Sequence, residues 1–182
     1  KETVKLPSEQ QILAALSAQE QLTIEAPKEE VFDSQLVKKA PRKGKIKTVT
    51  RNDEIGTTEW VLNNGIKVVF RPTEFKADEI LMQGFSKGGM TQVATADLPS
   101  AQLATAIVEF SGLGDFSMTQ LEKALTGKTV SVSPSISANT ESLRGSSSVK
   151  DLETMLQLTY LYFTAPRRDE KAYETLMGLM RN

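Results

Sequence analysis

The chain contains neither cysteine nor histidine, so its fold has to be held by a hydrophobic core without disulfides. These two residue types also supply most structural and catalytic zinc ligands. Histidine is moreover the only side chain whose unperturbed pKa lies between about pH 5 and 8. Catalytic triads that use histidine or cysteine are therefore excluded, and the lack of cysteine leaves the redox compartment open.

Size and charge indicate one domain with an extension. At 182 residues, of which 39% are hydrophobic, the chain can bury one core but hardly two. Its 22 basic and 23 acidic residues nearly cancel, so no strong field draws the whole molecule to nucleic acid or membrane. The chain begins at Lys1 without a methionine and stops at Asn182 within a helical pattern, so we expect it to be a piece of a longer polypeptide.

A basic stretch from Lys38 to Lys47 is the best local candidate for a nucleic-acid site. It lacks aromatic residues for base stacking, and an acidic segment precedes it. We interpret it as a solvated linker and predict no nucleic-acid partner. No apolar run is long enough for a transmembrane helix, which predicts no membrane insertion.

The first part of the chain differs in composition from the rest. Ser8 and Gln11 have the spacing of a capping box, which predicts a helix with a narrow apolar stripe. A second segment, residues 28–39, has few apolar residues to bury. We therefore interpret residues 1–48 as a helical interdomain linker or arm and residues 49–182 as the main domain.

The main domain opens with signals for antiparallel strands. Residues 57–62 and 66–71 flank Asn64-Gly65, a pair that suits a two-residue hairpin turn because both positions tolerate positive φ. Residues 80–86 predict a further strand, which we expect to adjoin this hairpin. A second hairpin, rich in serine, is predicted for residues 129–136 and 141–147.

Helices are predicted between and after these strands. Residues 97–110 are apolar around nearly the whole helical circumference, which predicts burial on several sides. Ser117 and Gln120 form a second capping box before a shorter helix. Ser148 with Asp151 precedes a helix rich in leucine and methionine, and another helix begins near Asp169. The order predicts an α+β fold with a mostly antiparallel sheet.

Several short motifs could indicate chemistry, but each has a plainer interpretation. Gly127-Lys128-Thr129 and Gly112-x-Gly114 lack the other glycines of phosphate-binding loops and follow helices, so we interpret them as helix ends. Ser147-x-x-Lys150 has no companion motif of a serine hydrolase. The aromatic residues Tyr160, Tyr162 and Phe163 are interpreted as core rather than as a ligand platform.

Four stretches have characteristic sequences: WVLNNGIKVVFRP at 60–72, ILMQGFSKGG at 80–89, KDLE at 150–153 and YLYFTAPRRDE at 160–170. Together with the element order, they resemble the pitrilysin-type zinc metallopeptidase family, which includes insulysin and the mitochondrial processing peptidases. The resemblance covers about residues 56–182, most of one family domain without its final part. It implies an α+β half-shell domain with helices packed on one face of the sheet.

The family's active members carry an inverted zinc motif, H-x-x-E-H, on the helix after the first strands. The resemblance places Thr105 and Glu109 at the two histidine positions and Val108 at the position of the base. Threonine is a poor zinc ligand, valine cannot accept a proton, and one carboxylate does not make the three ligands of catalytic zinc. The resemblance thus implies a domain with no metal ligands or catalytic residues of its own, and zinc in a separate catalytic domain.

The first functional hypothesis is therefore a non-catalytic structural and peptide-enclosing domain of a larger zinc metallopeptidase. Its expected partners are the other domains of that peptidase and the peptide substrate in the shared chamber. The resemblance slightly favours the bacterial periplasm or cell envelope. We also expect exposed apolar patches, because a domain separated from its neighbours loses the contacts that covered it.

The alternative hypothesis is a free-standing scaffold or interaction module of the same fold without a peptidase partner. A catalytic H-x-x-E-H domain in the complete parent sequence would favour the first hypothesis, and its absence would favour the second. An independent hydrolase using serine, lysine or carboxylates has no convergent motif to support it.

Overall fold

A computed structural model of the chain describes residues 6–22 and 33–181, which fall into two compact units divided after Asp33. In the smaller unit, helix α1 (Glu9–Glu20) begins at the predicted capping box, in which Ser8 and Gln11 exchange both hydrogen bonds. The apolar side chains of α1 are exposed. Residues 28–32 lie outside the described residues, and residues 33–39 form no helix.

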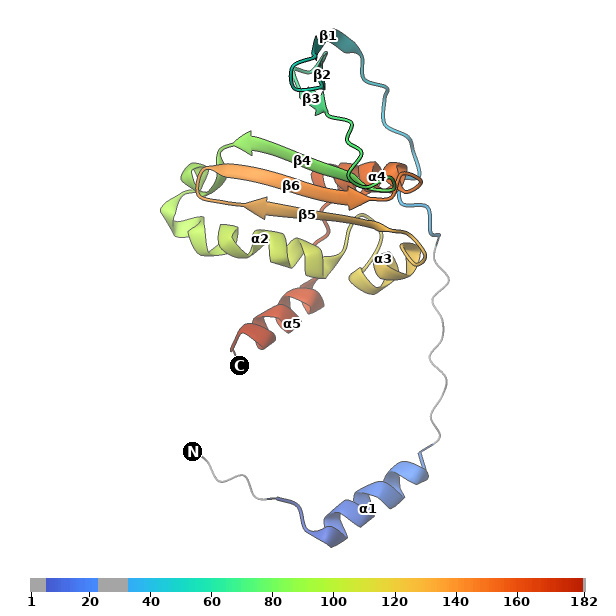
Figure 1. The fold of residues 1–182 in the computed structure, drawn as a ribbon. Coiled ribbons are helices and arrows are strands. Elements are labelled where there is room, and N and C mark those ends of the chain that lie inside the picture. The colour runs from blue at the N-terminus through green and yellow to red at the C-terminus, as the bar shows by residue number, and fades with distance from the viewer. Residues whose placement is uncertain (1–5, 23–32, 182) are drawn as a thin grey trace. The chain divides into compact units, whose positions relative to one another are not determined.

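The larger unit, Ser34–Asn182, contains two separate three-stranded antiparallel sheets (Figure 1). The first has the order β1-β2-β3 and the second has the order β4-β6-β5. Both predicted hairpins are present, but the first is closed by the three residues Asn63 to Gly65 rather than by the predicted two, and only Gly65 among them has a positive φ. The strands are β1 (Ile46–Asn52), β2 (Thr57–Leu62), β3 (Lys67–Phe70), β4 (Ile80–Lys87), β5 (Val130–Ile136) and β6 (Thr140–Ser147).

The expectation that residues 80–86 adjoin the first hairpin was wrong. Strand β4 pairs with β6 from Ile80 opposite Ser147 to Lys87 opposite Thr140. This register places Met82 beside Gly145 under a helix, whereas the residues of β3 are mostly exposed. Pairing with β6 therefore buries apolar surface that pairing with β3 does not offer.

Strand β1 and the segment before it, residues 34–45, belong to the larger unit, although the sequence analysis placed residues up to 48 in the arm. Every residue of β1 is exposed, so its sequence shows no alternation of apolar and polar residues that would have predicted a strand. In residues 34–45, Leu36 is buried and Lys38 Nζ forms an ion pair with Asp115 Oδ2 at 2.8 Å. The boundary between residues 48 and 49 stays a prediction about the domains of the parent protein.

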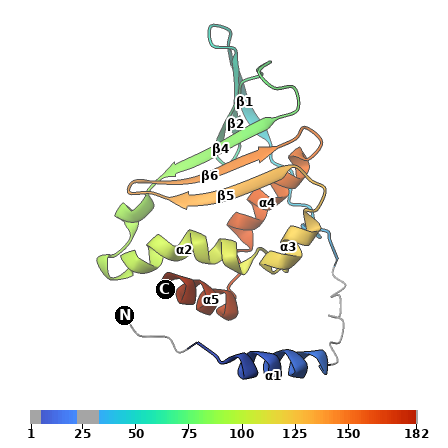
Figure 2. The same cartoon turned by 60° about the horizontal axis from the view of Figure 1, so that its bottom comes forward.

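The helices of the larger unit follow the predicted order. Helices α2 and α4 both contact the β4-β6-β5 sheet, and α5 packs on α2 (Figure 2). The predicted capping box of Ser117 and Gln120 is confirmed at the start of α3. The α-helices are α2 (Leu98–Ser111), α3 (Met118–Ala124), α4 (Leu152–Thr164) and α5 (Glu170–Arg181), and the short 3-10 helices are η1 (Gly89–Gln92) and η2 (Thr95–Asp97).

The core lies between α4 and one face of the β4-β6-β5 sheet. Strand alternation directs Val132 and Leu143 to this face, and α4 covers them with Met155, Leu158 and Leu161. The predicted α+β fold, antiparallel with helices packed on one face, is confirmed. Residues 97–110 were expected to be buried on several sides: α2 does contact several elements, α5 and β5 among them, but its apolar residues are only half-buried, because one of its sides borders an open groove.

A hydrogen-bonded corner joins the start of β5, the end of β6 and the start of α4. The Ser148 hydroxyl donates to Asp151 Oδ2 at 2.6 Å, and the Thr129 amide donates to the same oxygen at 2.9 Å. These two donors, the Ser148 hydroxyl first, hold the pKa of Asp151 below its ordinary value. The ionised carboxylate therefore stabilises the folded state.

The pH dependence of stability tests this corner. Because the folded-state pKa of Asp151 is lowered, its contribution is present above the unfolded pKa of about 4 and is lost as pH falls through the folded pKa. We expect Asp151→Asn to lower the midpoint of urea unfolding at pH 7, and the difference from the wild type to narrow below about pH 4. Asp53→Asn, in the exposed β1–β2 turn, is the control and should show neither effect. A difference that stays constant down to pH 2 would contradict the assignment.

The connection from α2 to α3 depends on Gly112. This residue has φ 87° and ψ −166°, a conformation essentially restricted to glycine. A Cβ at this position would overlap the carbonyl oxygen of Phe116 and lie 2.7 Å from the carbonyl carbon of Ser117. The tight turn buries Leu113 and Phe116, and Gly114 donates to the carbonyl of Ala165 at the end of α4.

Alanine at three glycines should separate backbone strain from steric overlap. We expect Gly112→Ala to lower the free energy of unfolding by about 3 kcal/mol or more, because both effects act there. Gly127 has φ 79° but open space around it, so Gly127→Ala should cost about 1 to 2 kcal/mol. Gly178 in α5 has neither constraint, and Gly178→Ala should stabilise the chain by up to about 1 kcal/mol. Urea unfolding measures all three, and equal losses at Gly112 and Gly127 would be the contrary result.

Candidate functional site

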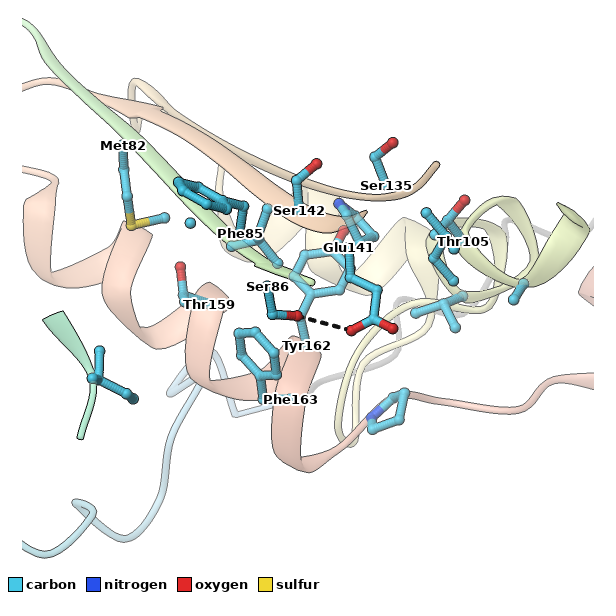
Figure 3. A pocket seen from close by; sticks show the side chains of 18 residues that line it. Met82, Phe85, Ser86, Thr105, Ser135, Glu141, Ser142, Thr159, Tyr162 and Phe163 are labelled. Carbon is cyan, nitrogen blue, oxygen red and sulfur yellow. Dashed lines mark hydrogen bonds between the residues drawn. The ribbon is translucent and has the colours of Figure 1, made fainter. Parts of the chain in front are cut away.

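A groove with a volume of about 570 Å³ lies between the β4-β6-β5 sheet, α2 and α4. Most of its lining is apolar, and Glu141 is the ionisable acid among the lining residues. Figure 3 shows Met82, Tyr162 and Phe163 together on the side of the sheet from which Ser135 and Ser142 point away. The lining residues are Ile66, Met82, Gly84, Phe85, Ser86, Ala104, Thr105, Val108, Pro134, Ser135, Ile136, Glu141, Ser142, Leu143, Thr159, Tyr162, Phe163 and Pro166.

Two of the three positions that the resemblance assigns to the family's zinc motif lie at this groove. Thr105 and Val108 of α2 line it, whereas Glu109 is exposed and is not part of the lining. A hydroxyl, an isopropyl group and one solvated carboxylate are not the donor set that zinc requires. Among residues 6–22 and 33–181, no cluster of three potential metal-ligating side chains occurs. The residues present therefore do not fit a catalytic zinc ion.

Tyr162 carries the most strongly shifted ionisable group of the groove. Burial of the phenol, and secondarily the negative charge of Glu109, raise its pKa to about 12. The hydroxyl consequently stays protonated at neutral pH and can donate a hydrogen bond, but it cannot serve as a base. The effect of Glu109 on Tyr162 places this carboxylate near the groove without making it a lining residue.

The one carboxylate in the lining is already engaged in structure. Glu141 Oε2 accepts a hydrogen bond from the Ser86 hydroxyl at 3.0 Å, drawn as a dashed line in Figure 3. Glu141 Oε1 accepts from the amide of Gly89 at 3.3 Å. The two hydrogen bonds thus connect β6 to the end of β4 and the start of η1. The described residues that line the groove include no second carboxylate with which Glu141 could form a catalytic acid pair.

The interpretation of Tyr160, Tyr162 and Phe163 as core was wrong for two of them. Phe163 is 76% exposed and Tyr160 is 37% exposed, whereas Tyr162 is half-buried in the groove wall. Met155, Leu158 and Leu161 of α4 already fill the interface with the sheet, so the aromatic side chains extend past it. Met82 and Phe163 were not predicted as site residues, because apolar residues on a strand and a helix have no sequence signal that separates groove from core.

The other motifs lie apart from this groove. Gly127 ends the turn after α3, as predicted for a helix stop. Ser147 is buried and its hydroxyl has no hydrogen-bond partner among the residues that the structure describes, while Lys150 is exposed. Exposed apolar surface was predicted and is confirmed on several elements, with Leu81, Phe85, Leu156 and Phe163 all more than half exposed.

Two substitutions in α4 test the division between groove wall and core. We expect Phe163→Ala to change the free energy of unfolding by less than about 1 kcal/mol, because the ring is largely solvated. Leu158→Ala, on the same helix but 3% exposed, should cost about 2 to 5 kcal/mol. Urea unfolding of both variants is the measurement. If Phe163→Ala lowered the free energy of unfolding as much as Leu158→Ala does, Phe163 would have to be part of the core.

Sequence comparison relates the chain to two zinc proteases, while no family model matches it. The zinc protease PQQL-like protein of Arabidopsis thaliana is 28% identical over 157 residues, which cover 85% of this chain and 14% of that protein. The probable zinc protease PqqL of Haemophilus influenzae is 22% identical over 100 residues, which cover 55% of this chain and 11% of that protein.

Solved structures share the fold. The periplasmic protease PqqL from Escherichia coli has a TM-score of 0.73 and 20% identity, covering 95% of this chain and 19% of that one. A mutant of the ferredoxin protease FusC in complex with Arabidopsis ferredoxin has a TM-score of 0.70 and 25% identity, covering 98% of this chain and 20% of that one. This chain thus spans a fifth or less of the length of each relative. The resemblance found in the sequence is confirmed: the chain is homologous to part of the pitrilysin-type zinc proteases.

Proposed function

We propose that this chain is a non-catalytic structural and peptide-enclosing domain of a larger zinc-dependent peptidase. The observation that carries the proposal is that Thr105, Val108 and Glu109 of α2, to which the resemblance assigns the positions of the zinc ligands and base, cannot hold zinc or accept the proton. In this proposal a separate homologous domain supplies zinc and catalysis, and this domain closes the chamber.

The chain's size and surface support this role. The chain spans a fifth or less of its relatives, so a longer parent protein has room for a separate catalytic domain. Large apolar side chains exposed on β4 and α4 provide surface for neighbouring domains. Residues 49–182 would form the enclosing domain, and residues 1–48 would be the arm that joins it to the rest of the parent.

The proposed partners are the other domains of the peptidase and the peptide within its chamber. The proposed compartment is the bacterial periplasm or cell envelope; the E. coli relative is a periplasmic protease. Within the described part of the chain, no helix is long and apolar enough to cross a membrane. The alternative function, a scaffold of the same fold without a peptidase partner, would use the same exposed apolar surface.

Metal content and turnover test the proposal together. The purified 182-residue chain should contain far less than one zinc per molecule and should not hydrolyse an unstructured peptide. In the complete parent protein, Glu109→Gln should leave kcat within about twofold, because one carboxylate cannot hold catalytic zinc. Deleting residues 49–182 from the parent should abolish turnover of the same peptide.

Each alternative has a distinct result in these measurements. One zinc per isolated chain that is lost on Glu109→Gln would overturn the non-catalytic assignment. A parent protein that hydrolyses no peptide and instead forms a stable assembly would establish the scaffold function. Full turnover after deletion of residues 49–182 would show that the domain does not enclose the substrate.

A further inference from the structure

The face of the β4-β6-β5 sheet that points away from the helices has a regular composition. Gly145, Met82 and Met155 lie together on the helix side, since a Cβ on Gly145 would be 2.9 Å from Met82 Cε and 2.8 Å from Met155 Sδ. Alternation therefore assigns the remaining residues of each strand to the opposite face. We call this surface the open face, and its central residues are Leu81, Gln83, Phe85, Ser131, Ser133, Ser135, Ser142, Arg144 and Ser146.

Strand register arranges the open face in three rows. Arg144 of β6 lies directly between Gln83 of β4 and Ser133 of β5. One neighbouring row contains Leu81, Ser146 and Ser131, and the other contains Phe85, Ser142 and Ser135. The guanidinium is thus at the centre of a field of hydroxyl groups, with Leu81 and Phe85 beside it along β4. A hollow of about 420 Å³ is lined by residues of the first two rows, Arg144 included.

The charge of Arg144 is not compensated within the described chain. Between residues 33 and 181, no carboxylate lies within ion-pair distance of its guanidinium, and its side chain is exposed. The acid that precedes β4, Glu79, is paired with Lys76 at 2.7 Å. Lys87, at the end of β4, adds a second positive charge to the same face by alternation. The open face is therefore complementary to a carboxylate.

The spacing of the side chains on the open face indicates which ligand would fit it. Leu81 and Phe85 are 74% and 75% exposed and lie two residues on either side of Gln83, which neighbours Arg144. Alternate residues of an extended chain share one face at roughly 6.7 Å intervals, and neighbouring strands lie about 4.8 Å apart. An extended peptide running along β4 would thus place side chains i and i+4 on Leu81 and Phe85, and side chain i+2 within reach of Arg144.

We propose that the open face binds extended peptides in which an acidic residue has an apolar residue two positions before it and two positions after it. Arg144 takes the carboxylate in a charge-assisted hydrogen bond. Leu81 and Phe85 contact the apolar side chains, and the neighbouring serine hydroxyls and Gln83 provide donors and acceptors for the peptide backbone. This inference deepens the proposed function, on which it rests, by assigning the open face rather than the groove to the substrate.

Binding of dye-labelled peptides to the 182-residue chain tests the proposal. The probe is an acetylated Ser-Leu-Ser-Glu-Ser-Leu-Ser peptide, and its matched control has glutamine in place of glutamate. We expect the glutamate peptide to bind about tenfold more tightly than the control in fluorescence anisotropy at low salt. The preference should decrease as the salt concentration rises, because the guanidinium is solvated.

Variants of the chain locate the carboxylate. Arg144→Gln should remove the preference for glutamate, and Arg144→Lys should keep part of it, since lysine retains the charge without the planar fork. Arg168→Gln removes another exposed positive charge elsewhere and should change nothing. Circular dichroism of each variant shows whether it is folded, and Arg144 is exposed, so its replacement leaves the core intact.

Three results would overturn the proposal. Equal affinity for the glutamate and glutamine peptides would remove the carboxylate site. Unchanged preference in Arg144→Gln would place the site elsewhere, and peptide-induced NMR shifts confined to α2 and α4 would place it in the groove. Self-association that Arg144→Gln abolishes would make the face an interface between copies. These measurements use the isolated chain, so they stand apart from the turnover experiments on the parent protein.

Discussion

The contact between α4 and the middle of β6 determines most of the larger unit. Met155 is 1% exposed and lies where Gly145 leaves space that a Cβ would fill. Because Gly145 pairs with Met82 on one side and Val132 on the other, this one position brings all three strands under the helix. Alternation then assigns every other residue of the sheet to a face, and the separation of the apolar face from the hydroxyl-rich face follows.

The groove exists because α4 and α2 together cover only part of the apolar face of the sheet. Helix α4 fills the part nearest the Asp151 corner, and α2 approaches the other end, leaving Thr105 and Val108 across from Pro134 and Ile136. Helix α2, to which the resemblance assigns the zinc motif, lies beside the sheet, and Thr105 and Val108 there are not zinc ligands. Position in the fold and chemistry of the site are separable properties, because packing needs only apolar contacts whereas coordination needs particular donor atoms.

Local features of the structure could be predicted, and distant pairings could not. The capping boxes of Ser8 and Ser117 depend on residues within a few positions of one another, so the sequence predicts them fully. The Asn64-Gly65 pair predicts the first hairpin, although not its three-residue turn. The pairing of β4 with β6 joins residues far apart in the chain, and its advantage lies in a contact with Met155 that no local pattern describes. Strand β1 has no buried side at all, so its residues give no periodicity to detect.

The candidate site was only partly accessible to sequence reasoning for the same physical reason. Thr105 and Val108 could be placed by resemblance, but the exposure of Phe163 depends on how far α4 extends past the sheet. Arg144 gave no signal on its own, because an isolated arginine in a strand is ordinary. Only the register, which puts Gln83 and Ser133 beside it and serines in the two neighbouring rows, shows that no acidic residue in these rows lies next to its guanidinium.

The two faces of the sheet differ in the chemistry that they offer to a peptide. On the helix side, Glu141 is occupied by Ser86 and Gly89, and the Tyr162 phenol stays neutral, so that side offers mainly apolar contact. On the open side, the guanidinium of Arg144 can gain a partner without losing one. A charged ligand loses hydration wherever it binds, and only a site with an uncompensated opposite charge restores that loss. In our proposal the open face therefore recognises acidic peptides, and the groove, whose lining is mostly apolar, offers apolar contact.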